Sequence, residues 1–89
     1  MRLHVVVSGR VQGVGFRWFV RETAIELDLA GWVRNRADGL VEVVAEGTDD
    51  SVARFRQALV QGPPHAHVAS VDDVPSDARE LKRPFEIAR

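Results

Sequence analysis

The sequence predicts an α+β fold in which one antiparallel sheet is covered on one face by two helices. Short apolar or alternating segments bounded by turn residues are typical of strands, and two longer segments repeat apolar residues every three or four positions, as amphipathic helices do. These segments follow one another as strand, helix, strand, strand, helix, strand, the split βαβ or ferredoxin-like plan. The 89 residues suit one domain, residues 1–89.

The first unit is a strand, a loop and a helix. Residues 3–8 form an apolar run of strand length, and a glycine-rich loop follows. Apolar side chains then recur at helical spacing, at Phe16, Val20, Ala24 and Leu27. We therefore expect the loop to join a buried strand to the N-terminus of a helix that packs on the sheet.

A hairpin of two strands comes next, over residues 31–36 and 40–46. Asp38-Gly39 stands between them, and this pair favours the positive φ angles of a tight hairpin turn. Apolar and acidic residues alternate in the second strand, so one of its faces is predicted to lie in the core.

A second helix and two more strands complete the predicted fold. Thr48 stands where a capping side chain is expected, two acidic residues follow it, and Gly62-Pro63-Pro64 ends the helix. The apolar stripe of this helix comprises Val52, Phe55 and Leu59. Later apolar residues predict a fourth strand at Val68, Val71 and Val74 and a short edge strand at Phe85 and Ile87, after Pro84.

Composition excludes several classes of protein. The net charge of −1 lacks the basic excess of a dedicated nucleic-acid binder, and the absence of cysteine excludes disulfides and thiolate chemistry. The strands at 3–8 and 40–46 carry no aromatic residue on which RNA bases would stack. The first apolar run is too short for a signal peptide or a membrane span. We expect a cytoplasmic monomer without nucleic-acid or membrane partners.

Residues 9–17 have the composition of a phosphate-binding loop. Glycines let several backbone N–H groups converge on one anion, and a helix N-terminus adds a partial positive charge. Arg17 then supplies a planar cation that matches two phosphoryl oxygens. Neither a Walker loop nor a dinucleotide fingerprint is present, which favours a single phosphoryl group. The predicted phosphate-binding residues are Gly9, Arg10, Val11, Gln12, Gly13, Val14, Gly15, Phe16 and Arg17.

Two segments together resemble the signatures of acylphosphatases. They are residues 9–17, and residues 31–35, Gly-Trp-Val-Arg-Asn, followed by Asp38-Gly39. The resemblance implies hydrolysis of acyl phosphates without a metal or an organic cofactor, with Arg17 binding phosphate and Asn35 positioning water. It implies a small-molecule substrate, with inorganic phosphate or sulfate as a competing anion. One departure is Asp28, where the family often has glycine at the end of the first helix.

The residues fit this chemistry. An acyl phosphate leaves as a carboxylate with a pKa of about 4, so no strong general acid is required. Phosphoryl transfer needs mainly positioning and charge stabilisation, and a neutral Asn35 orients water without placing a negative charge beside phosphate. A phosphoryl oxygen of the substrate is then a candidate base. The alternative is a non-catalytic phosphate-binding or regulatory module of the same fold.

Several side chains near these motifs allow two interpretations. Trp18 and Phe19 belong either to the core or to an aromatic wall for the acyl group. Arg34 and Arg36 share one face of a strand, where they attract an anionic substrate or simply solvate an edge. His4 stands alone in the first strand, and His65 and His67 flank Ala66 near a proline, an arrangement that does not predict a metal site.

Overall fold

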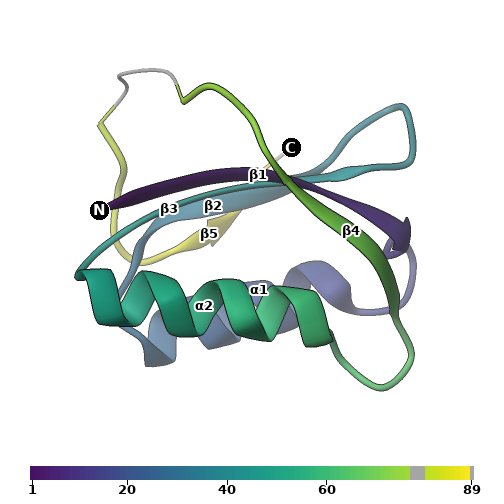
Figure 1. Cartoon of the computed structure of the whole chain (residues 1–89), viewed down its shortest axis with the longest axis horizontal. Coiled ribbons are helices and arrows are strands. Elements are labelled where there is room, and N and C mark those ends of the chain that lie inside the picture. Colours follow the sequence, from purple (N-terminus) through teal and green to yellow (C-terminus); the bar gives the residue numbers. More distant parts are fainter. Residues whose placement is uncertain (77–79, 89) are drawn as a thin grey trace.

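Two helices, both on the same side, lie against one face of a five-stranded sheet (Figure 1). The computed structural model describes residues 1–76 and 80–88. In chain order the elements are β1 (Arg2–Arg10), α1 (Phe16–Glu26), β2 (Ala30–Asn35), β3 (Val41–Glu46), α2 (Asp49–Gln61), β4 (His67–Asp73) and β5 (Glu86–Ile87). The predicted α+β plan is confirmed.

The strands are ordered β4-β1-β3-β2-β5 in the sheet. The four longer strands pair in antiparallel fashion, as predicted. The short edge strand differs, because β5 pairs with β2 in parallel, which makes the sheet mixed. Since β4 and β5 occupy opposite edges, the last connection returns across the sheet and β5 runs in the direction of β2.

The core lies between the sheet and the two helices. The stripe of α1 buries Phe16, Val20 and Ala24, while Leu27 lies at its margin and is only partly buried. The strand side of the core is mostly valine, a side chain that packs well on a pleated surface. The predicted stripe of α2 is fully buried, at Val52, Phe55 and Leu59. Neither α1 nor α2, the helices of the described residues, is long and apolar enough to span a membrane.

The N-termini of the two helices differ. In α2, the Thr48 hydroxyl accepts a hydrogen bond from the Ser51 N–H at 3.1 Å, and Asp49 and Asp50 lie in the first turn. This confirms the predicted cap. The N-cap of α1 is Gly15, which offers no side chain to its N–H groups, and its first turn has no acidic residue. The sequence therefore leaves the positive end of α1 open.

The C-terminus of α1 is capped although Asp28 stands where glycine is common in the family. Asp28 takes the left-handed conformation with φ 56°, and its N–H donates to the Ile25 carbonyl at 3.1 Å. Its own carbonyl accepts from the Arg83 guanidinium at 3.0 Å. Aspartate tolerates this conformation better than most residues with a Cβ, so the cap forms at some cost in backbone strain.

Candidate active site

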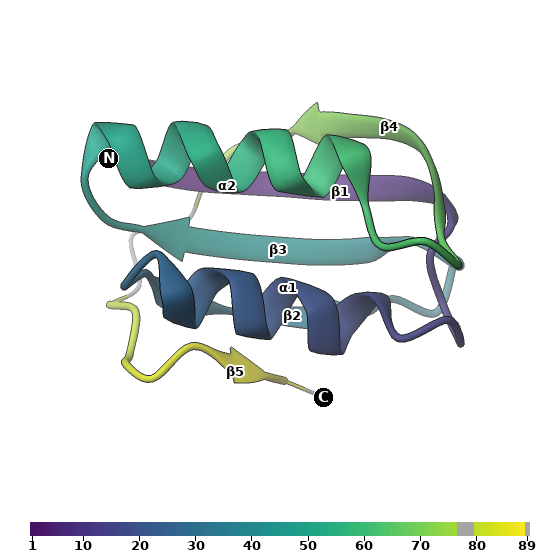
Figure 2. The same ribbon diagram turned by 90° about the horizontal axis from the view of Figure 1, so that it is seen from below.

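The β1–α1 loop and the β2–β3 hairpin lie at the same end of the molecule (Figure 2). β3 separates β1 from β2 in the sheet, so strand pairing alone does not bring the two segments together. Gln12 connects them. Its side-chain N–H groups donate to the carbonyl of Arg36 at 2.9 Å and to that of Leu40 at 3.0 Å. The loop is thus hydrogen-bonded directly to the turn that follows Asn35.

The first two residues of the predicted loop are part of β1. Gly9 pairs with Val68 at a register shift between β1 and β4. Its φ is 118°, and a Cβ there would lie 2.1 Å from the carbonyl oxygen of His67. Gly9 is therefore required by the close approach of two strands. Arg10 is the last residue of β1 and is exposed.

The loop proper contains Gly13 and Gly15. Both adopt positive φ, 74° and 78°, and no atom lies within 4 Å of the place where a Cβ would stand. The two glycines are therefore needed for the backbone conformation rather than for close packing. The space beside them is open, which leaves room for an anion to approach the backbone.

Arg17 lines a hollow of about 180 Å³ together with part of this loop. The side chain is half-buried, and within residues 1–76 and 80–88 it has no carboxylate partner, unlike most of the described arginines. An arginine at a helix N-terminus is opposed by the helix dipole by about 0.3 to 1 kcal/mol unless an anion is present. The other residues of the hollow are Val11, Gly13, Gly15, Phe16, Trp18 and Ile87.

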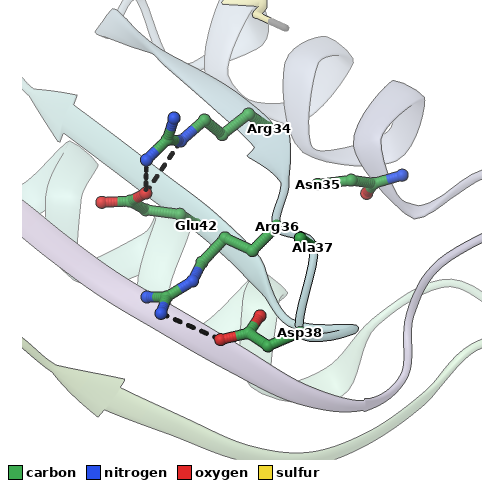
Figure 3. Close-up of a pocket in the computed structure, with 6 residues that line it drawn as sticks. All are labelled: Arg34, Asn35, Arg36, Ala37, Asp38 and Glu42. Atoms are coloured by element: carbon green, nitrogen blue, oxygen red, sulfur yellow. Dashed lines mark hydrogen bonds and ion pairs between the residues drawn. The ribbon is translucent and has the colours of Figure 1, made fainter.

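Asn35 is the last residue of β2, and its side chain points away from those of Arg34 and Arg36 (Figure 3). This is the alternation of a strand, and it directs Asn35 to the face of the sheet on which the helices pack. The Oδ1 atom is buried and has no hydrogen-bond partner among the described residues. A buried carbonyl oxygen without a donor is unfavourable by about 1 to 3 kcal/mol, and a bound water would satisfy it.

The two arginines on the opposite face are held by acidic residues. Arg34 contacts Glu42 at 2.7 Å and Arg36 contacts Asp38 at 2.9 Å (Figure 3). Glu42 also lies 2.7 Å from Nε2 of His4 on β1. Partial burial raises the pKa of Glu42, but hydrogen bonds to His4 and Arg34 outweigh burial and hold it below its ordinary value of 4.5. These contacts connect β1, β2 and β3 on the face of the sheet opposite to the Asn35 side chain.

The predicted site residues are thus distributed between two hollows. Arg17 and four others of the predicted set line the first, whereas Asn35 lines a wider one with Arg34 and Arg36. Gly9 and Arg10 belong to a strand, and the side chain of Gln12 is engaged with the hairpin. The remaining loop residue, Val14, packs against the core.

Comparison with known proteins identifies the family. The family model for acylphosphatase matches residues 3–87. The chain belongs to the acylphosphatase family. An acylphosphatase of Deinococcus radiodurans is 49% identical over 82 residues, which are 92% of this chain and 94% of that protein.

Solved acylphosphatase structures agree with this assignment. The crystal structure of the Bacillus subtilis acylphosphatase superposes with a TM-score of 0.91 at 41% identity, covering 99% of this chain and 98% of that one. An acylphosphatase structure from Coxiella burnetii gives 0.82 at 42% identity, covering 98% and 90%. The resemblance based on two sequence segments is confirmed.

Sequence reasoning did not anticipate two features of this member of the acylphosphatase family. Gln12 was expected to bind phosphate, and no local pattern indicated that its side chain would reach the hairpin. Ile87 was expected only as part of an edge strand, but it lines the hollow beside Arg17. The sequence showed only that Ile87 is an apolar residue on a short edge strand. Such a residue does not reveal which other segment it will contact.

Proposed function

We propose that Arg17 and the β1–α1 loop hold the phosphoryl group while Asn35 positions water, in the hydrolysis of acyl phosphates that this member of the acylphosphatase family catalyses. One observation carries these roles. The open N-terminus of α1 lies next to a cation that has no carboxylate partner in the described part of the chain. Backbone N–H groups and a guanidinium at one point favour a phosphoryl oxygen strongly.

The proposed reaction is an in-line displacement at phosphorus. The water oxygen forms a bond to phosphorus as the bond to the acyl oxygen breaks, and the electron pair of that bond leaves with the carboxylate. One proton of the water passes to a phosphoryl oxygen, so the products are a carboxylate and dihydrogen phosphate. The loop and Arg17 stabilise the charge on the equatorial oxygens during transfer.

Asn35 is proposed to aim the attacking water. Its unpaired Oδ1 can accept a hydrogen bond from water, which leaves a lone pair of the water oxygen free to attack. The amide carries no charge, so it does not repel the phosphoryl group. Gln12 contributes by tying the phosphate loop to the hairpin, and correct alignment of reactants is a major source of rate enhancement.

Steady-state hydrolysis of benzoyl phosphate tests the proposal. Arg17→Ala should lower kcat/KM by about a thousandfold, because it removes the charge that binds the transferring group. Asn35→Ala should lower kcat by about a hundredfold with a smaller change in KM. Arg21→Ala is the matched control, since Arg21 lies one turn along the same helix and pairs with Glu22.

The outcomes separate the two candidate functions. Native turnover that survives in the control and is lost in both variants supports the proposed roles. Turnover that persists in a folded Arg17→Ala protein contradicts them. A native protein that binds phosphate but hydrolyses benzoyl phosphate no faster than buffer does would instead be a regulatory anion-binding module.

The remaining expectations are proposals of the same kind. Inorganic phosphate and sulfate should inhibit competitively, because each presents the oxygens that the loop would bind. A monomeric state is supported by the positions of the exposed large apolar side chains of the described residues: apart from Trp18 and Ile87, which line one hollow, they lie on different elements. Size-exclusion chromatography and cell fractionation test the monomeric state and the proposed cytoplasmic location.

A further inference from the structure

Two large apolar side chains stand exposed beside Arg17. Trp18 is 63% exposed and Ile87 is 39% exposed, and both line the same hollow as Arg17. Phe16 also lines this hollow but is buried in the core. The sequence allowed either a core or a wall position for the aromatic residues after Arg17. Trp18 lies outside the core, whereas Phe19 packs against it.

The two apolar side chains come from segments far apart in the sequence. Trp18 lies in the first turn of α1, directly after Arg17. Ile87 comes from β5, where it is paired with Val33, two residues before Asn35. The Ala88 N–H donates to the Val33 carbonyl at 2.8 Å, so the end of β5 is held against β2. Ile87 is thus fixed to the strand that carries Asn35 while facing the hollow that contains Arg17.

The occupant of this apolar surface follows from the substrate. In an acyl phosphate, a single bridging oxygen separates phosphorus from the acyl carbon, so a phosphoryl group held by the loop places the acyl group within a few ångströms. Gly13 and Gly15 offer no side chain to it. Arg17 is the sole charged residue among those of the hollow, and its charge is used by the phosphoryl group. Trp18 and Ile87 are the exposed apolar side chains of the hollow that are available to the acyl group.

We propose that Trp18 and Ile87 form an acyl-group subsite that favours flat, apolar acyl groups over small ones. The inference rests on the proposed role of Arg17 and its loop. An indole face packs well against another ring, and the branched Ile87 side chain adds apolar surface that substrate binding would remove from water. The volume of about 180 Å³ leaves room for a single-ring acyl group.

The experiment compares kcat/KM for benzoyl phosphate and acetyl phosphate, which carry the same phosphoryl group. In Trp18→Ala, the benzoyl-to-acetyl ratio of kcat/KM should fall about tenfold, mainly through a higher KM for benzoyl phosphate, because the contact is made in the ground state and in the transition state alike. Trp18→Phe should retain part of the preference. Ile87→Ala should lower the ratio in the same direction.

Val60→Ala is the matched control, because Val60 is an exposed apolar residue of α2 that does not line the hollow. It should leave both substrates and their ratio unchanged. A native enzyme that hydrolyses both substrates, with a ratio unaffected by folded Trp18→Ala, overturns the subsite while leaving the proposed function intact. A native protein that hydrolyses neither substrate overturns the proposed function and the subsite with it.

Discussion

Replacement of Gln12 by alanine tests whether the bond between the phosphate loop and the hairpin aligns the site. The substitution removes two donors, which lie 2.9 and 3.0 Å from the carbonyls of Arg36 and Leu40. A net contribution of about 0.5 to 1.5 kcal/mol per hydrogen bond gives an upper value of about 3 kcal/mol. The Arg36 carbonyl is exposed and can bind water instead, whereas the Leu40 bond is partly buried. We therefore expect a loss of about 1 to 1.5 kcal/mol.

The same change should slow catalysis. Without the Gln12 hydrogen bonds, the β1–α1 loop is no longer fixed to the hairpin that follows Asn35. We expect kcat for benzoyl phosphate to fall about tenfold, because small misplacements of reacting groups have large effects on rate. Gln12→Glu should be at least as harmful, because an ionised carboxylate faces two carbonyl oxygens and cannot donate. The free energy of unfolding is measured in urea, and kcat by steady-state hydrolysis.

Gln57→Ala is the control for the loss of a glutamine side chain, since Gln57 is an exposed residue of α2. It should leave kcat unchanged. If Gln12→Ala unfolds at the same urea concentration as the native protein and keeps the native kcat, the Gln12 hydrogen bonds neither stabilise the fold nor align the site.

Two further predictions concern stability. Glu42→Gln keeps the shape of the side chain but removes its charge, and should lower the free energy of unfolding by about 1 to 2 kcal/mol at pH 7. Because the folded-state pKa of Glu42 lies below 4.5, its contribution is complete above that pH and is lost as the pH falls through the folded pKa. Urea titrations from pH 7 to pH 3 should therefore converge for the two proteins, and a constant difference would contradict this account. Asp28→Gly should stabilise the protein by about 0.5 kcal/mol, because glycine adopts φ 56° without strain and the ion pair lost with Arg83 is exposed. Thermal unfolding measures the change, and a lower Tm would show that the contacts with Arg83 outweigh the strain.

Much of the fold could be predicted because its signals are local. Apolar spacing predicted both helices and the residues that they bury, and Thr48 marked the start of α2. The boundaries of the strands shifted by one or two residues, since hydrogen bonding extends β1 to Arg2 and Arg10 beyond the apolar run. The parallel direction of β5 had no local signal, because it depends on how the chain crosses the sheet.

The sequence alone determined which residue types are available for chemistry at this end of the molecule. Glycines permit the positive φ angles of the β1–α1 loop, and arginine and asparagine, at positions 17 and 35, are residue types suited to binding phosphate and orienting water. Only the tertiary structure decided which distant residues join them. Gln12 reaches carbonyls 24 and 28 residues away, and Ile87 reaches the same hollow from the last strand. Contacts of this kind depend on strand order and loop closure, which no local pattern of residues encodes.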